Sequence, residues 1–391
     1  MVEFSKLISG IAPSATNVVS DKARELKRAG VDVIDLGGGD PDFNTPQHIV
    51  EAALQAMRSG QTHYVSARGI PELREAIARK LAAENGVNVD PATEVVVTPG
   101  GKMAIYAALQ SLVNPGDEVL CLEPAWVSYQ PIIELVGGSP VGVGLDPSDN
   151  YQVREDVLRR YVSPRTKAII VNSPNNPTGR VLSRAEWQTI ADLAVRHNLY
   201  VISDEIYEKL LYDGNRHISA ASLPELRDRT ITINGFSKTY AMTGWRLGYA
   251  AGDRNLMSLI VKVQQQTVTC APSFAQFAAL AALNGPQDVV EEMRQIYEAR
   301  RDMLVAELNK IAGVECAKPE GAFYVFVRFP GVDLPSVKLA EALLDKVAVA
   351  TTPGIAFGKA GEGFLRMTFA TSTEGLRAAP GRIAEALRQL A

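Results

Sequence analysis

Short and almost continuously hydrophobic runs recur through the middle of the chain. They lie at residues 94–98, 118–122, 168–172, 200–203 and 230–234. Runs of this length, rich in β-branched residues and not alternating with polar ones, are typical of strands buried on both faces of a sheet. Stretches with a helical period, such as residues 104–112 and 184–196, lie between them. Strands alternating with helices predict an α/β fold with a mostly parallel central sheet sandwiched by helices.

The two ends of the chain have a different pattern. Residues 288–311 predict one long amphipathic helix, which is followed by the alternating segments GAFYVFVRF and FLRMTFA and by a final helix near residues 373–390. This pattern indicates a smaller α+β layer. We therefore predict a large domain over residues 46–289 and a small domain built from residues 1–45 and 290–391.

Composition excludes several classes of protein. The chain has 391 residues, a formal net charge of −4 and no basic run, which is not the signature of a nucleic-acid binder. No run of about 18 apolar residues exists, so we expect no membrane span. The three cysteines, Cys121, Cys270 and Cys316, are far apart and odd in number, and the four histidines lack metal-ligand spacing. We expect no metal site, and a reducing compartment, the cytoplasm.

Polar, glycine or aromatic residues follow each of the five predicted strands. Ligands of open α/β sheets bind outside the carboxyl ends of the strands. The residues are Gly100, Gly101 and Lys102 after the first run, Trp126 after the second, Asn176 after the third, Asp204 and Tyr207 after the fourth, and Ser237 and Lys238 after the fifth. Together they predict one ligand site along one rim of the sheet.

The residue types at this rim leave two interpretations open for each position. Lys238 is either a surface lysine or a Schiff-base lysine, because burial lowers the pKa of an amine and frees its lone pair. Asp204 is either a helix N-cap or the partner of a buried pyridinium nitrogen. Arg246 is either a structural cation or a phosphate clamp. Gly100 and Gly101, directly before a helix, would let backbone N–H groups approach an anion.

Three motifs narrow these alternatives. NSPNNPTG, SDEIYE and SKTYAMTGWRLGY, in this order and spacing, resemble the class I/II aminotransferases of pyridoxal-phosphate (PLP) fold type I. The bacterial-type aspartate aminotransferase branch is most similar, and the resemblance runs from APSAT to FLRMTFATS. It implies the PLP-dependent transferase fold type I and a PLP cofactor. It also implies amino-group transfer between an L-amino acid and a 2-oxo acid such as 2-oxoglutarate, in ping-pong through pyridoxamine phosphate.

The resemblance also implies roles for the cofactor residues. Lys238 would form the Schiff base with the cofactor and then move a proton. Asp204 would keep the ring nitrogen protonated, Tyr207 and Asn176 would hydrogen-bond the ring oxygen, and Trp126 would stack on the ring. The phosphate would be bound by Gly100, Gly101, Lys102, Ser237 and Arg246, and by Tyr64 of a partner subunit, which makes the enzyme a homodimer with shared sites.

Substrate binding follows from the same resemblance. Arg366 would grip the α-carboxylate, with Gly39, Trp126 and Asn176 beside it; from the strand pattern alone, Arg366 could equally be a solvated strand position. Ser14, Thr16 and Lys102 match a pattern for acidic side chains, which indicates aspartate as the amino donor. That pattern is also compatible with prephenate, and aromatic or other specialised substrates stay open. Lyase or decarboxylase chemistry and a non-catalytic PLP-sensing domain are more remote alternatives.

Two departures from the family pattern bear on the substrate. This chain has Gly38 and Asp40 in a segment where members commonly read AGEPDF, and Arg68 near Tyr64 where a proline-containing stretch is frequent. Arg68 could alter the mouth of the site.

Overall fold

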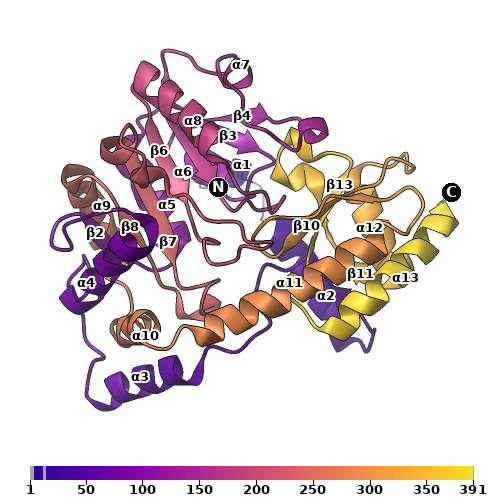
Figure 1. Cartoon of the computed structure of the whole chain (residues 1–391), viewed down its shortest axis with the longest axis horizontal. Helices are drawn as coiled ribbons and strands as arrows, with labels where there is room; N and C mark the ends of the chain where they lie inside the picture. Colours follow the sequence, from indigo (N-terminus) through magenta and orange to yellow (C-terminus); the bar gives the residue numbers. More distant parts are fainter. Residues whose placement is uncertain (1–3, 12–14, 391) are drawn as a thin grey trace.

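The computed structural model describes residues 4–11 and 15–390, and a seven-stranded sheet forms the centre of its larger part (Figure 1). The strand order is β2-β8-β7-β6-β5-β3-β4. The strands are β2 (Val95–Thr98), β3 (Glu118–Glu123), β4 (Ser139–Gly144), β5 (Thr166–Asn172), β6 (Tyr200–Asp204), β7 (Thr230–Gly235) and β8 (Gly248–Ala251). β8 pairs antiparallel with β2 and β7, and the other pairs are parallel. The five predicted strands therefore share one direction, and their carboxyl ends share one rim.

Both faces of this sheet are covered, which explains the continuous hydrophobic runs. In β2, Val96 packs into a cluster with residues of α5 (Gly101–Leu112), α6 (Tyr129–Leu135) and α9 (Arg254–Thr267). Its neighbours Val95 and Val97 pack into a different cluster with α3 (Gln47–Arg58), α4 (Pro71–Lys80) and α10 (Ser273–Asn284). Farther along the sheet, α7 (Glu155–Leu158) and α8 (Arg184–His197) cover strands β3 to β6. The prediction of a mostly parallel sheet sandwiched by helices is confirmed.

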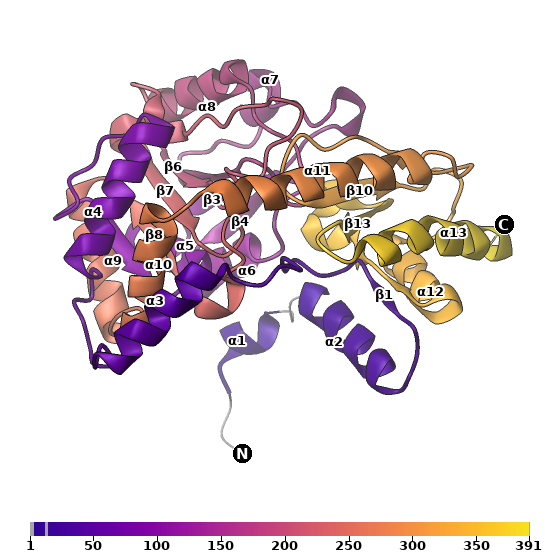
Figure 2. The ribbon, with the colours of Figure 1, turned by 60° about the horizontal axis from the view of Figure 1, so that its bottom comes forward.

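A second layer is built from the two ends of the chain. A four-stranded sheet has the order β12-β13-β10-β9, with β9 (Glu315–Cys316), β10 (Tyr324–Arg328), β12 (Thr352–Pro353) and β13 (Phe364–Thr368). Near the N-terminus, β1 (Ile34–Asp35) pairs with β11 (Val349–Ala350), which brings α2 (Ala15–Arg28) close to the C-terminal elements (Figure 2). The predicted limits of the two domains, residues 46–289 against the rest, stay a prediction.

Long helices complete this layer. The predicted helices at 288–311 and 373–390 correspond to α11 (Asp288–Leu308) and α13 (Thr373–Leu390), and α12 (Ser336–Val347) lies beside α13. The short α1 (Lys6–Gly10) has no buried residue. Across the described ranges, no helix combines the length and the hydropathy needed to cross a membrane.

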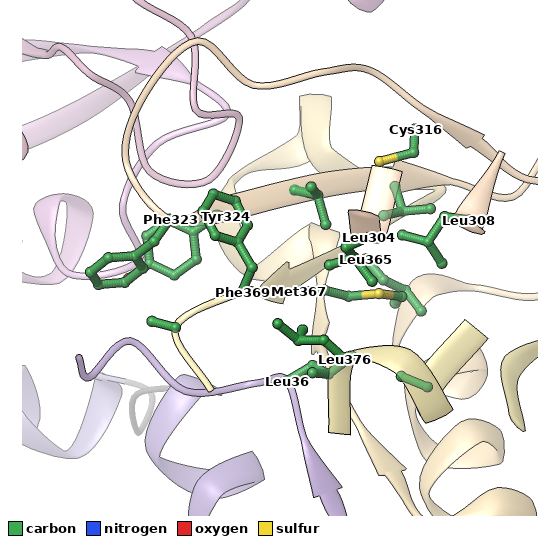
Figure 3. Close-up of a cluster of buried hydrophobic side chains, with 14 of the residues drawn as sticks. Leu36, Leu304, Leu308, Cys316, Phe323, Tyr324, Leu365, Met367, Phe369 and Leu376 are labelled. Carbon is green, nitrogen blue, oxygen red and sulfur yellow. The ribbon is translucent and has the colours of Figure 1, made fainter. Parts of the chain in front are cut away.

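The core of the second layer reaches toward the central sheet. Leu304 and Leu308 of α11 meet Leu365 and Met367 of β13 in one cluster of buried side chains (Figure 3). Tyr207, which follows β6 of the central sheet, belongs to the same cluster. Residues from both layers therefore share one packed core.

Candidate active site

A cavity of about 600 Å³ opens at the predicted rim of the central sheet, and residues of the second layer help to line it. Predicted site residues that line this cavity are Gly39, Gly101, Lys102, Trp126, Asn176, Asp204, Tyr207, Ser237, Lys238, Arg246 and Arg366. A pocket of this size suits a small ligand and a cofactor-sized group.

Lys238 lies in the turn that follows β7. Its ammonium nitrogen Nζ donates a hydrogen bond to the carbonyl oxygen of Gly39 at 2.5 Å. Burial lowers the pKa of Lys238 from its ordinary 10.5 to about 8, because the interior disfavours the charged amine. The neutral, nucleophilic amine is therefore present at a far lower pH than in a surface lysine.

Asp204 ends β6 and is buried, with 5% of its surface exposed. Its Oδ2 accepts a hydrogen bond from the hydroxyl of Tyr129 at 2.6 Å, and its backbone carbonyl accepts one from the side chain of Asn172 at 2.9 Å. Burial raises the pKa of Asp204 from 3.8 to about 6, and the bond from Tyr129 opposes this change. The carboxylate is thus fixed in place and needs a cation to satisfy it.

Asn176 and Tyr207 connect the rim to the second layer. The backbone N–H of Asn176 donates to Asn172 Oδ1 at 2.8 Å, and its side-chain amide donates to the Tyr207 hydroxyl at 3.5 Å. The Tyr207 hydroxyl also lies 3.1 Å from the hydroxyl of Tyr324 in β10. Burial raises the pKa of Tyr207 well above 10, so the hydroxyl keeps its proton and can donate a hydrogen bond.

Arg366 in β13 is 1% exposed, so the interpretation as a solvated strand position is wrong. Its guanidinium donates to Asn176 Oδ1 at 3.1 Å and to the carbonyl oxygen of Gly37 at 2.6 Å, and it lies over the ring of Tyr324. Its Nε is buried and has no partner among the described residues. A guanidinium held this way and still lacking an acceptor is well suited to a carboxylate ligand.

The amino end of α5 forms a cradle for an anion. Gly100 precedes the helix with φ +86°, and no side chain caps the first turn, so its backbone N–H groups are free of a side-chain acceptor. A Cβ at Gly100 would lie 2.7 Å from Nη2 of Arg246, which shows how closely the guanidinium approaches this turn. The positive end of the helix and Arg246 therefore face the same small volume.

Lys102 and Trp126 form another side of the cavity. The ammonium of Lys102 lies 4.9 Å from the centre of the Trp126 ring. Burial lowers the pKa of Lys102, and the nearby charge of Arg246 adds to this effect. No carboxylate of the described chain pairs with this ammonium in a salt bridge, so the cation is available to a ligand.

Tyr64 does not line this cavity, and the structure does not test Ser14 or Thr16. Tyr64 is 85% exposed and is absent from the lining of the cavity. Ser14 lies outside the described residues, and Thr16 lies in α2 with its side chain outside the described part. Arg68 donates to the carbonyl oxygen of Thr93 at 2.8 Å and does not line the cavity either.

Sequence reasoning missed two tyrosines of the site. Tyr129 lies three residues after Trp126 in the segment that follows β3, and that proximity was the available signal. Tyr324 lies in an alternating strand, and its position over Arg366 depends on the pairing of β10 with β13, which a sequence pattern does not reveal.

These residues fit PLP. The cofactor needs an amine for its aldehyde, an anion for its ring nitrogen and a cradle for its phosphate. Lys238, Asp204 and the amino end of α5 offer these three features on the rim of one cavity. The buried Nε of Arg366, without a partner in the part of the chain that the structure describes, offers a further place for a carboxylate.

Comparison with known proteins agrees with this fit. The family model described as aminotransferase class I and II matches residues 31–383. An aspartate aminotransferase of Pyrococcus abyssi is 45% identical over 97% of each chain, and an aspartate/prephenate aminotransferase of Thermus thermophilus is 43% identical over 98% of each. The solved structure of an aromatic aminotransferase from Pyrococcus horikoshii has a TM-score of 0.90 and 46% identity, covering 94% of this chain and 99% of that one.

The chain belongs to the aminotransferase class I and II family. It is a PLP-dependent aminotransferase with the fold of that family.

Proposed function

We propose that this aminotransferase moves the amino group of aspartate to a 2-oxo acid such as 2-oxoglutarate. The observation that carries the proposal is the pair of cations in one cavity: Arg366, which has a buried Nε without a partner in the described chain, and Lys102, which lacks a salt bridge there. A dicarboxylic substrate offers one carboxylate to each. The printed names of the aspartate aminotransferases among the relatives support the same substrate.

We assign the cofactor contacts by the geometry of the rim. Asp204 would pair with the protonated ring nitrogen, and Tyr207 and Asn176 would donate hydrogen bonds to the ring hydroxyl oxygen. Trp126 would stack on the ring face. The phosphate would lie at the amino end of α5, bound by Gly100, Gly101, Lys102, Ser237 and Arg246.

The reaction then needs one proton-moving group and a fixed substrate. The bound cofactor supplies an electron sink for the bond broken at the substrate Cα. Arg366 would bind the α-carboxylate, with Gly39 beside it, and so fix the orientation of the substrate Cα. Lys238, whose pKa is lowered by burial, would take the proton from the substrate Cα. It would then deliver that proton to the cofactor carbon that is bonded to the transferred nitrogen. Holding the carboxylate in this way disfavours decarboxylation.

A homodimer with shared sites is part of the proposal. Tyr64 is 85% exposed, and Phe4 and Ile8 near the N-terminus are also exposed, which is typical of surfaces that a partner covers. Tyr64 would reach the phosphate of the partner subunit. We also propose that the enzyme works in the cytoplasm.

Aspartate is tested by a ratio of rate constants. The ratio of kcat/KM for aspartate to that for alanine should fall about ten- to a hundredfold in Lys102→Met, because a charge-assisted hydrogen bond is worth roughly 1.5–3 kcal/mol and alanine has no side-chain carboxylate that could make this bond. Equal losses on both substrates would assign Lys102 to the phosphate alone.

A second substrate class is kept because two relatives carry it in their names, prephenate in one and aromatic amino acids in the other. A half-reaction screen with amino acids separates aspartate from the aromatic amino acids as the amino donor. Each amino acid is mixed with the PLP form of the protein, and the 2-oxo acid formed per subunit is measured. A wild type that converts aromatic amino acids faster than aspartate would refute the aspartate assignment and leave the aminotransferase reaction in place.

A further inference from the structure

A second set of buried charged groups lies next to the site but has no part in the roles above. The turn that carries Asp204 and Tyr207 also carries Glu205, which is 0% exposed, and Glu208, which is 7% exposed. Neither carboxylate lines the cavity. We call these two residues, together with Lys80, Asn85 and His217, the buried carboxylate cluster.

Glu205 accepts hydrogen bonds from several directions. Its Oε1 accepts from the hydroxyl of Ser203 at 3.0 Å, the hydroxyl of Ser219 at 2.8 Å and the backbone N–H of Ala220 at 3.2 Å. Its Oε2 lies 2.9 Å from Nε2 of His217. The loop at 217–220 is therefore tied to the residue that directly follows Asp204.

Glu208 is held by a specific local structure. α4 is followed by a single π-helical turn, η1 (Leu81–Asn85), which begins directly after Lys80 and ends at Asn85. Asn85 donates to Glu208 Oε2 at 2.7 Å, and the ammonium of Lys80 contacts Oε1. Although burial alone would raise it, the positive charges of Lys80 and His217 bring the pKa of Glu208 down to about 2. Such π turns occur frequently at functional sites.

The cluster is an ionic network and not a metal site. The donor atoms of Glu205, Glu208 and His217 lie within 4.8 Å of one another, which would suit a cation. However, the ammonium of Lys80 already contacts Glu208, and hydroxyl and N–H donors already occupy Glu205. Other charged or titratable neighbours are Glu84, 3.7 Å from Lys80, and the buried Tyr249 and Tyr240. The pKa of each tyrosine is raised mainly by burial and also by Glu208.

The cluster acts on Asp204 through charge as well as position. Glu205 adds a negative charge directly beside Asp204, and that charge raises the pKa of Asp204 after the larger effect of burial. Other titratable groups that face Asp204 are Tyr129, which donates to it, Lys238 and Tyr207. Burial alone would lower the pKa of His217, but the carboxylate of Glu205 reverses this, and the pKa lies above 6.5. Glu205 therefore favours the protonated form of His217.

We propose that the buried carboxylate cluster positions the cofactor site: it fixes the turn that carries Asp204 and Tyr207, and the ion pair of Glu205 with His217 sets the charge that Asp204 faces. This inference rests on the proposed role of Asp204 toward the ring nitrogen. The residues of the cluster are positioning residues, because none of them lines the cavity.

Two isosteric changes test the network in opposite directions. Glu205→Gln keeps the acceptor Oε1 and removes a negative charge, so Asp204 should ionise more readily. His217→Gln keeps a donor near Glu205 and removes a positive charge, so Asp204 should ionise less readily. The measurement is the dissociation constant of PLP between pH 5 and pH 8. We expect the pH at which affinity falls by half to move down in the first variant and up in the second, by about 0.5 to 1 pH unit each.

The matched control is Glu118→Gln. Glu118 is 7% exposed and bonded to Ser163 and Arg165, but it begins β3 and so lies at the amino-terminal rim of the sheet, opposite the rim that carries the site. It should lower stability without moving the pH midpoint. If the pH midpoint of PLP affinity moves in the same direction in both cluster variants, or moves in neither, the proposed role of the cluster is overturned. A wild type whose PLP affinity does not depend on pH refutes instead the role proposed for Asp204.

A measurement without PLP tests the ion pair between Glu205 and His217 independently. In the apoprotein, the imidazole of His217 can be titrated by NMR of labelled histidine, since the chain has four histidines. The midpoint for His217 should fall in Glu205→Gln and stay unchanged in Glu118→Gln. An unchanged midpoint in Glu205→Gln would overturn the proposed charge pairing.

Discussion

Burial sets the chemistry of the two ionisable residues at the centre of the site. Both Lys238 and Asp204 lose water, and in both cases the charged form becomes less favourable, so the pKa of the lysine falls to about 8 and that of the aspartate rises to about 6. A neutral amine is needed to attack an aldehyde, and an ionised carboxylate is needed to pair with a ring cation. Near neutral pH, the same cavity therefore holds an ionised Asp204 and a lysine of which a fraction is neutral.

Lys238 should be the residue that PLP modifies. Borohydride reduction of the PLP form should leave the cofactor on the peptide that contains Lys238, and Lys238→Ala should lower turnover on the order of 10²- to 10⁴-fold. Because its pKa is about 8, the rate at which the apoprotein forms the covalent adduct should rise with pH up to about 8 and then level off. Label on another lysine would contradict the assignment.

Asp204→Asn should separate stability from function. The pKa of Asp204 is higher in the folded protein than its ordinary 3.8, so the folded apoprotein binds a proton that the unfolded chain has released. Stability from this group is present below pH 4 and is lost as pH rises through about 6. Above pH 6, apo Asp204→Asn should therefore be more stable than wild type by up to about 3 kcal/mol.

The same substitution should weaken PLP binding about ten- to a hundredfold, because the ring nitrogen loses an ionic partner. Urea unfolding of the apoprotein and equilibrium dialysis with PLP measure the two effects. A variant that is destabilised at neutral pH and still binds PLP as tightly as wild type would refute the role.

Among the helices and strands, the amino end of α5 is sensitive to a single added methyl group. Gly100 has φ +86° and ψ 162°, a conformation essentially restricted to glycine, and its added Cβ would meet Arg246 at 2.7 Å. Gly100→Ala should weaken PLP binding about tenfold or more, because the N–H groups and the guanidinium both shift. Gly116→Ala is the matched control, since Gly116 also has a positive φ of +89° but an added Cβ meets nothing within 4 Å.

Both glycine variants should lose stability through backbone strain of about 1–3 kcal/mol. Only Gly100→Ala should change the dissociation constant of PLP. Equal affinities in the two variants would show that this turn does not contact the phosphate.

The elements could be predicted where burial alone decides them. Five strands are buried on both faces, and their continuous hydrophobic runs predict them: β2, β3, β5, β6 and β7. β4 and β8 were missed, because β4 contains Pro140, Gly142 and Gly144 and β8 reads GYAA. Short strands of small residues depend on their neighbours in the sheet and not on their own propensity.

The site residues could be predicted from the sequence where a motif directly follows a strand. Contacts between elements that are distant in sequence could not be predicted in this way. The bond of Lys238 to Gly39 spans 199 positions, and the place of Tyr324 between Tyr207 and Arg366 follows from strand pairing. The spacing of the four histidines predicts no role for His217, and only the fold shows that it faces Glu205.

At the scale of the whole molecule, the active site depends on segments from both ends of the chain. β1 pairs with β11, which holds the segment that leads to Gly39 beside the sheet that carries Arg366. The central sheet carries most of the proposed cofactor residues, and the second layer carries Arg366, the proposed α-carboxylate site. A chain cut between the layers would therefore lose the substrate site even if the central sheet folded.

The proposed sharing of sites between two subunits leads to a test by mixing. Tyr64 is exposed in one subunit and should serve the phosphate of the other. A homodimer of Tyr64→Ala has two sites that lack the hydroxyl, and a homodimer of Lys238→Ala has two sites without the lysine. In a mixed dimer, one site carries both defects, and the other has its own Lys238 and the partner's intact Tyr64.

Mixing the two inactive variants under conditions that exchange subunits should therefore restore activity. Random exchange of equal amounts makes half of the dimers mixed, and each has one intact site of two, so activity should approach about a quarter of wild type. If Tyr64 serves its own subunit, no combination contains an intact site, and activity stays at the sum of the two variants. Exchange itself is checked by mass spectrometry of the intact dimers, so absence of recovery in an exchanged sample would refute the shared site.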